Sequence, residues 1–197
     1  MLTKAQFLEP LAKLRTDQAI VATMGVVRPW GRMSSSDLDF ASADSAMGHA
    51  ADLALGVALA QPARQVICLN GDGSMLMSLG TMATIVESGA KNLVLFVVVN
   101  GTYEITGNQR TPGSGTVDFA AMATAAGFPR VYRFENGDEY QATLPEVLSG
   151  EGPVFVAVDM ERGSEGPISR SAAEDTEYLK VSLAEWARRF RKALTGS

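Results

Sequence analysis

The sequence of 197 residues has a net charge of −5, is 46% hydrophobic and contains one cysteine. This negative balance excludes nucleic-acid binding driven by charge, and a lone cysteine excludes a disulfide within the chain. The longest wholly apolar run, Leu93–Val99, is far shorter than the roughly 18 residues that a membrane-spanning helix needs. Lys4, Glu9 and Lys13 follow a helical pattern that does not fit a signal peptide, so we expect a cytoplasmic protein without membrane or nucleic-acid partners.

Cap and turn residues divide the first half of the chain into alternating helices and strands. Thr3 and Gln6 have the spacing of a capping box, and Gly89 stands where a helix commonly ends in a left-handed residue. The apolar pattern between these signals predicts a helix after Thr3, a strand over Ala19–Met24, a loop from Gly25 to Ser36, a helix over Ser45–Ala60, a strand over Val66–Leu69 and a central helix over Ser74–Ser88.

The second half continues the alternation, with Asp118 as a helix cap and Gly127 as a helix end. The expected elements are a strand over Leu93–Val99, a flexible loop over Thr102–Thr116, a helix over Phe119–Ala126, a strand over Val131–Phe134, a helix over Glu139–Leu148, a strand over Val154–Val158 and a C-terminal helix at about 173–194, clearest over Ser182–Leu194. This order predicts an α/β fold, with one domain over residues 1–197 and a three-layer, doubly wound parallel sheet of about five or six strands.

Polar residues follow two neighbouring buried strands. Asp72 lies in the segment Asn70-Gly71-Asp72-Gly73-Ser74 after the first, and Asn100 follows the second. A right-handed strand–helix–strand unit brings both loops to the carboxyl edge of the sheet, where sites of such folds lie. Carboxylate, amide and backbone carbonyl oxygens suit Mg²⁺ or Ca²⁺, and the helix that begins at Gly73 and Ser74 favours a phosphate.

Gly-Asp-Gly alone is a common turn, but here 26 residues, Ser74 to Val99, separate it from Asn100. This arrangement resembles the metal–diphosphate motif of thiamine diphosphate enzymes. The resemblance implies that the side chains of Asp72 and Asn100 and the backbone carbonyl of Thr102 ligate Mg²⁺. Two departures are Val99, where the family usually has a first asparagine, and Thr102, where it commonly has glycine.

Three further segments resemble the phosphonopyruvate and sulfopyruvate decarboxylase branch of this family: S-A-M-G-H-A at 45–50, C-L-N-G-D-G-S at 68–74 and E-I-T-G-N-Q at 104–109. The resemblance covers roughly residues 20–160 and implies a decarboxylase of a small anionic 2-oxo acid. Two alternatives remain open: a non-catalytic scaffold subunit that keeps the fold, and a subunit of a thiamine-dependent carboligase or oxidative decarboxylase.

The resemblance also implies roles for single residues. Met47 occupies the position of the apolar residue that supports the bent cofactor, while an ordinary core methionine is the alternative. His49, the only histidine, and Glu104 are candidate catalytic residues; a structural histidine and a solvated loop residue are the alternatives. The full set of expected cofactor-binding residues is Gly25, Met47, Gly48, His49, Gly71, Asp72, Gly73, Ser74, Asn100, Thr102, Tyr103 and Glu104.

The sequence also suggests residues that bind the substrate, and the resemblance implies a partner subunit. Arg28, Arg32 and Arg110 lie in predicted loops and could meet an anionic substrate. Enzymes of the resembled family activate the cofactor through a glutamate on a second, pyrimidine-binding domain, for which this chain has no room. We therefore expect a separate subunit that supplies this glutamate, within a homo- or hetero-oligomer.

Overall fold

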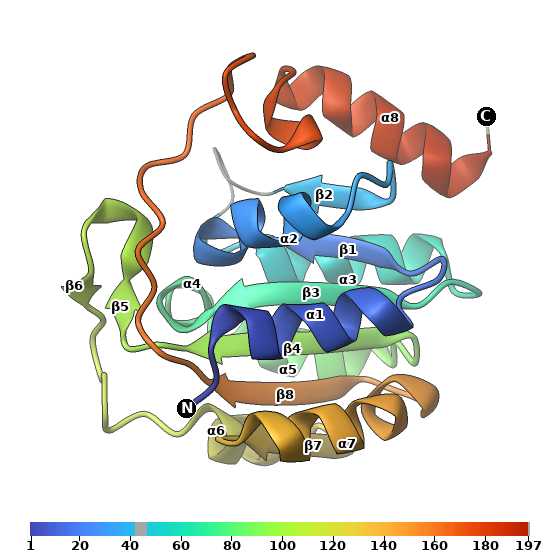
Figure 1. Cartoon of the computed structure of the whole chain (residues 1–197). Coiled ribbons are helices and arrows are strands. Elements are labelled where there is room, and N and C mark those ends of the chain that lie inside the picture. Colours follow the sequence, from blue (N-terminus) through green and yellow to red (C-terminus); the bar gives the residue numbers. More distant parts are fainter. Residues whose placement is uncertain (42–46, 197) are drawn as a thin grey trace.

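The computed structural model describes residues 1–41 and 47–196, and within them six parallel strands form one sheet (Figure 1). The strand order is β2-β1-β3-β4-β8-β7, and every neighbouring pair is parallel. The strands are β1 (Ala19–Ala22), β2 (Asp39–Ala41), β3 (Val66–Gly71), β4 (Leu93–Val99), β7 (Arg130–Phe134) and β8 (Val154–Asp159). The predicted doubly wound α/β fold is confirmed.

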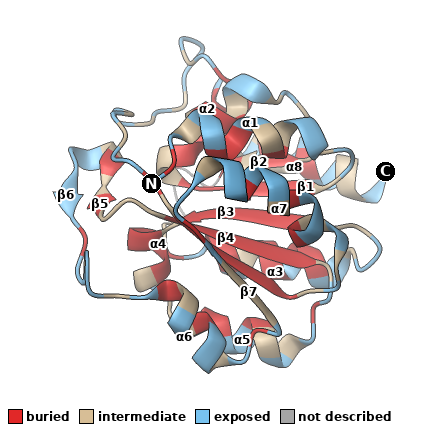
Figure 2. Ribbon diagram, turned by 60° about the horizontal axis from the view of Figure 1, so that its bottom comes forward, coloured by how far each residue is buried: buried red, intermediate tan, exposed pale blue. Residues whose placement is uncertain are grey.

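Helices cover both faces of this sheet. One face packs against α1 (Lys4–Leu14), α2 (Val27–Met33) and α7 (Gly137–Ser149), and the other against α3 (Ala50–Ala60), α5 (Thr81–Ser88) and α6 (Phe119–Ala126). Successive β4 residues alternate between the two resulting cores, with Leu95 in one and Phe96 in the other. The central strands are therefore buried on both sides, as Figure 2 shows, which explains their continuous apolar sequence.

The chain ends are fixed to the edges of this assembly. The capping box of α1 is confirmed, since Thr3 Oγ1 accepts a hydrogen bond from Gln6 N while Gln6 Oε1 accepts one from Thr3 N. At the other end, α8 (Leu183–Thr195) lies against β2. The Trp186 indole nitrogen donates a hydrogen bond to the carbonyl oxygen of Asp39 at 2.6 Å.

Several predicted boundaries are wrong. The expected loop from Gly25 to Ser36 is mostly helical, because Val27 and Trp30 share a face that is buried in the core. The expected helix Ser74–Ser88 is two helices, α4 (Asp72–Leu76) and α5, separated by a turn that ends at Gly80. The C-terminal helix begins at Leu183, after its cap Ser182, rather than at 173.

Other differences are smaller. The first strand ends at Ala22, and the short edge strand β2 was not predicted. The expected flexible loop after Asn100 contains a hairpin of β5 (Thr102–Tyr103) and β6 (Gln109–Arg110). The start of the expected helix Ser45–Ala60 lies partly outside the described residues, and the regular helix α3 begins at Ala50. No helix within residues 1–41 and 47–196 is long and apolar enough to cross a membrane.

Candidate active site

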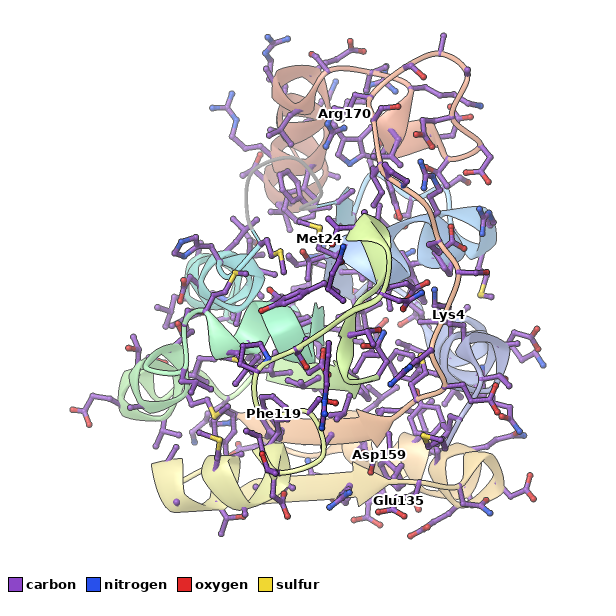
Figure 3. All side chains as sticks on the ribbon, turned by 90° about the vertical axis from the view of Figure 1, so that its left-hand side faces the viewer. Lys4, Met24, Phe119, Glu135, Asp159 and Arg170 are labelled. Carbon is purple, nitrogen blue, oxygen red and sulfur yellow. The ribbon has the colours of Figure 1, made fainter. Side chains whose placement is uncertain are left out.

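A cavity of about 660 Å³ lies at the carboxyl edge of the sheet. Figure 3 looks onto this edge and labels two residues that line the cavity, Lys4 of α1 and Met24, which follows β1. The predicted site residues that line the cavity are Gly25, Met47, Gly71, Asp72, Gly73, Ser74, Asn100, Thr102, Tyr103 and Glu104. Lining residues that sequence reasoning did not identify include Lys4, Met24 and Asn70.

Asp72 joins the two loops that end β3 and β4. Its Oδ1 accepts a hydrogen bond from Gly73 N at 2.6 Å, and its Oδ2 accepts one from Gly101 N at 2.7 Å. The predicted proximity of the Asp72 and Asn100 loops is therefore confirmed. Backbone donors from both loops fix the carboxylate, so its orientation does not depend on a flexible side-chain partner.

Burial governs the charge of Asp72, whose residue is 3% exposed. Desolvation raises the pKa of this carboxyl above its ordinary value, although hydrogen bonds from the backbone at Gly101 and Gly73 act in the opposite direction. An ionised carboxylate at this position lacks a charged partner among the described residues. A bound divalent cation would offset the cost of burying this charge. The surroundings of Asp72 are therefore those expected of a metal ligand.

The remaining expected metal donors lie on the turn after β4. Asn100 Oδ1 accepts a hydrogen bond from Thr102 N at 3.0 Å, and Gly101 between them has a φ of +71°, which favours glycine. Both Asn100 and Thr102 line the cavity beside Asp72. No group of three His, Cys, Asp or Glu residues in the described part of the chain could hold a metal, and the expected oxygen set contains only one such residue.

Gly73 allows the hairpin to approach α4 closely. A Cβ at Gly73 would overlap Cε1 of Tyr103 and lie 2.7 Å from its Cδ1. Gly48 is tied both to α4 and to the turn after it, because Gly48 N donates to Ser74 Oγ at 2.9 Å and Ser78 Oγ donates to the Gly48 carbonyl oxygen. Gly48 itself does not line the cavity, whereas Met47 does. The two hydrogen bonds of Gly48 fix the turn that carries Met47.

Gly73→Ala is expected to destabilise the fold by about 1–3 kcal/mol, because Tyr103 and the hairpin must move away from α4. Gly80→Ala is the matched control, since a Cβ at Gly80 meets nothing within 4 Å and its φ is −59°. Urea unfolding of both variants measures the effect. Equal unfolding midpoints for Gly73→Ala and Gly80→Ala would contradict the close packing described here.

The two candidate catalytic residues have different surroundings. The side chain of His49 is 70% exposed, and its Nδ1 lies 2.8 Å from Oδ2 of Asp52. His49 does not line the cavity, and a role for it stays a prediction. Glu104 lines the cavity, and its carboxylate is buried and paired with Lys4.

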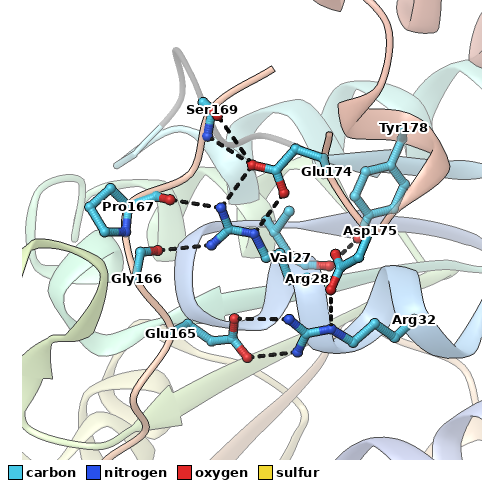
Figure 4. Close-up of polar contacts among 10 residues, drawn as sticks. All are labelled: Val27, Arg28, Arg32, Glu165, Gly166, Pro167, Ser169, Glu174, Asp175 and Tyr178. Carbon is cyan, nitrogen blue, oxygen red and sulfur yellow. Dashed lines mark hydrogen bonds and ion pairs between the residues drawn. The ribbon is translucent and has the colours of Figure 1, made fainter. Parts of the chain in front are cut away.

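The predicted substrate cations bind groups of this chain, and Figure 4 shows the contacts of Arg28 and Arg32. Arg28 forms a bidentate pair with Glu174, and Arg32 pairs with both Glu165 and Asp175. Arg28 also donates to the carbonyl oxygens of Gly166 and Pro167. Arg110 donates to the Ser114 carbonyl oxygen, and none of the three arginines lines the cavity. The expectation that they meet the substrate is therefore not supported by their positions.

Arg28 and Arg32 instead hold residues 161–176, a segment without regular secondary structure that we call the strap. Its residues Pro167 and Ile168 form part of the cavity wall. Hydrogen bonds donated by the Arg28 guanidinium lower the pKa of Glu174 from 4.5 to about 2. The lowered pKa means that the pair stabilises the folded chain above pH 4.5, and that this stabilisation is lost as the pH falls toward 2.

Glu174→Gln is expected to lower the urea midpoint at pH 6, because it removes the charge that Arg28 binds. The difference between wild type and variant should shrink at pH 3, because this pH lies below the ordinary pKa of 4.5, so the Glu174 carboxyl is protonated in the unfolded chain while it stays mostly ionised in the folded one. Glu177→Gln, at an exposed carboxylate three residues on, serves as the control. A difference that stays constant between pH 6 and pH 3 would rule out the linkage.

Comparison with known families identifies the fold. The family described as thiamine pyrophosphate enzyme, C-terminal TPP binding domain, matches residues 17–158. The chain belongs to this family. Benzoylformate decarboxylase from Polynucleobacter necessarius has a similar structure, with a TM-score of 0.68 at 22% identity over 85% of this chain and 34% of its own. The predicted thiamine diphosphate-binding fold is therefore confirmed, and thiamine diphosphate (the same compound as thiamine pyrophosphate) is the cofactor of this family.

Within the thiamine pyrophosphate family, two curated relatives differ in length. A phosphonopyruvate decarboxylase from Streptomyces viridochromogenes is 39% identical over 186 residues, which are 94% of this chain and 44% of the relative. Sulfopyruvate decarboxylase subunit beta from Methanothermobacter thermautotrophicus is 29% identical over 198 residues, which are 100% of this chain and 98% of the relative. The chain thus spans less than half of the first relative and nearly the whole of the second.

Proposed function

We propose that this chain is the thiamine diphosphate- and Mg²⁺-binding subunit of a decarboxylase of small anionic 2-oxo acids, such as sulfopyruvate or phosphonopyruvate. The observation that carries the proposal is the buried carboxylate of Asp72, fixed by backbone donors from two loops and facing a cavity beside Asn100 and Thr102. The names of the two relatives support the substrate class. A cytoplasmic location is part of this proposal.

The residues of this chain bind and orient the cofactor. Asp72, Asn100 and the Thr102 carbonyl would hold Mg²⁺, and the backbone at Gly73 and Ser74 would meet the diphosphate. Met47, beside the anchored Gly48, would support the organic part of the cofactor. The bound cofactor supplies a ring that accepts the electrons released when carbon dioxide leaves the substrate.

A separate subunit completes the proposed enzyme. The relative that this chain covers almost entirely is named as a beta subunit, whereas the phosphonopyruvate decarboxylase is more than twice as long as the matched region. We propose that the partner chain carries the pyrimidine-binding domain and the glutamate that activates the cofactor. The assembly is then a hetero-oligomer in which neither chain is active alone.

Carbon dioxide release tests this function. The chain would be produced alone and together with a partner encoded nearby, then supplied with thiamine diphosphate, Mg²⁺ and either sulfopyruvate or phosphonopyruvate. We expect carbon dioxide and an aldehyde from the mixture only. Full activity of this chain alone would refute the split arrangement, and no activity with any 2-oxo acid would favour the scaffold alternative.

Carboligation is the second candidate, because the large subunit of acetolactate synthase isozyme 1 from Escherichia coli is 31% identical over 68% of this chain and 25% of its own length. The same assay distinguishes the two reactions by product. A decarboxylase releases one aldehyde for each carbon dioxide, whereas a carboligase joins the remaining fragment to a second oxo compound. A 2-hydroxy-oxo acid as the main product would replace the decarboxylase proposal.

A further inference from the structure

Glu104 is a buried carboxylate in the cavity wall whose two oxygens have different surroundings. Its side chain is 3% exposed. Oε1 accepts hydrogen bonds from Lys4 Nζ at 2.5 Å and from the backbone nitrogen of Glu165 in the strap at 2.8 Å. Oε2 is buried as well, and no donor within residues 1–41 and 47–196 reaches it. Burying a carboxylate oxygen without a donor is costly, so this oxygen is suited to accept a hydrogen bond from a molecule bound in the cavity.

Lys4 is held in place by its neighbours in the chain. It is the first residue of α1, directly after the cap Thr3. Leu2 N donates to the Asp159 carbonyl oxygen at 2.8 Å, at the end of β8, and Glu161 N donates back to the Leu2 carbonyl oxygen at 2.9 Å. The backbone just before Lys4 is therefore fixed at the carboxyl edge of the sheet, and Lys4 lines the cavity there.

Two glycines make room for the carboxylate. A Cβ at Gly163 would overlap Oε1 of Glu104 and lie 2.5 Å from Lys4 Nζ, so a larger residue at this point of the strap would displace the Glu104–Lys4 pair. A Cβ at Gly25, which lines the cavity, would lie 2.8 Å from Oε2. The paired oxygen thus faces α1 and the strap, whereas the unpaired oxygen lies beside a cavity residue.

We propose that Lys4 is a positioning residue: it holds Oε1 of Glu104 so that Oε2 is presented as a hydrogen-bond acceptor to an N–H or O–H group of the molecule bound in the cavity. The proposal rests on the proposed function, which supplies the molecule. A fully ionised 2-oxo acid has no such donor, whereas thiamine diphosphate has an amino group. The donor therefore belongs to the cofactor, and the negative Oε2 is unsuited to the anionic groups of the substrate.

Glu104→Gln keeps the size and shape of the side chain but removes the hydrogen-bond acceptor that faces the cavity. Lys4 Nζ and Glu165 N are both donors, so the glutamine must place its amide oxygen where Oε1 lies and its NH₂ group where Oε2 lies. The change turns an acceptor into a donor at the cavity and puts two donors face to face. Lys4→Met keeps the aliphatic stem of the lysine but releases Oε1.

The test is calorimetric titration of the chain, with its partner present, using thiamine diphosphate and Mg²⁺. We expect Glu104→Gln and Lys4→Met each to weaken binding by about tenfold, and the double variant to bind no more than about twofold more weakly than Glu104→Gln alone. Lys4→Arg should restore most of the affinity, because it keeps a charged donor. Lys13→Met, at an exposed position on the same helix, should bind like wild type.

The outcomes separate this proposal from the proposed function. No cofactor binding by the wild type refutes both. If Lys4→Met binds the cofactor as strongly as wild type, the role of Lys4 is refuted. It is also refuted if the affinity loss of the double variant is the product of the two single losses, because independent residues contribute additively to the binding free energy. Thermal unfolding of each variant is followed in parallel. A loss of affinity that Lys4→Arg fails to restore, together with lowered melting temperatures, would assign Lys4 to folding alone.

Discussion

Asp72→Ala is expected to weaken Mg²⁺-dependent binding of thiamine diphosphate by about 100-fold or more, since removal even of groups that only orient a metal ligand costs about 10–100-fold. The variant removes the proposed carboxylate ligand and leaves Gly73 N and Gly101 N without their acceptor. Calorimetric titration in Mg²⁺ and in a chelator measures the effect. Chelation should reduce wild-type binding to about the level of the variant.

Asp37→Ala is the control, because this exposed aspartate does not line the cavity. The pH dependence gives a second check. Because burial raises the pKa of Asp72, the carboxyl takes up a proton at a higher pH than the ordinary value of 3.8. Metal affinity should therefore fall as the pH is lowered through this raised pKa, before ordinary aspartates are protonated. Binding by Asp72→Ala at wild-type strength would mean that the metal is held elsewhere.

Trp186→Ala is expected to lower the free energy of unfolding by about 3–5 kcal/mol. Trp186 is buried, packs its ring against Tyr178 with centroids 5.9 Å apart, and donates a hydrogen bond to the Asp39 carbonyl oxygen at the start of β2. The substitution leaves a cavity and an unpaired carbonyl between α8 and the sheet. Urea unfolding followed by circular dichroism measures the loss.

This second prediction also tests whether residues 1–197 form one cooperative domain, as the sequence predicts. Trp186→Ala should move a single unfolding transition of the whole chain. Arg188→Ala, on the exposed side of the same helix, should change stability by less than about 0.5 kcal/mol. If α8 melted separately while the sheet kept its wild-type midpoint, the C-terminal helix would be an independent unit.

The strands and the two loops of the proposed metal site were predictable because their signals are local. Long apolar runs that end in small polar segments mark β3 and β4, and the parallel topology then determines that Asp72 and Asn100 share an edge. The cap at Thr3 and the left-handed Gly89 were equally readable, and both are confirmed. The strand β2 was missed because three residues at a sheet edge give almost no pattern.

Long-range pairing explains the remaining errors. Arg28 was expected to be free for a substrate, but its carboxylate partner Glu174 lies 146 residues away in the sequence. Lys4 was interpreted as an ordinary helix lysine, because nothing near it indicates a partner 100 residues away at Glu104. The strap that brings these groups together has no regular secondary structure, so no periodicity predicts its path.

The most direct test of the central claim is a crystal structure of the chain, with its partner where one is found, grown with thiamine diphosphate and Mn²⁺ in place of Mg²⁺. Anomalous scattering locates the manganese without reference to the protein. We predict one manganese bound by Asp72, Asn100 and the Thr102 carbonyl oxygen, with the diphosphate beside Gly73. A manganese and diphosphate bound away from Asp72, or an occupied cavity without metal, would contradict the account.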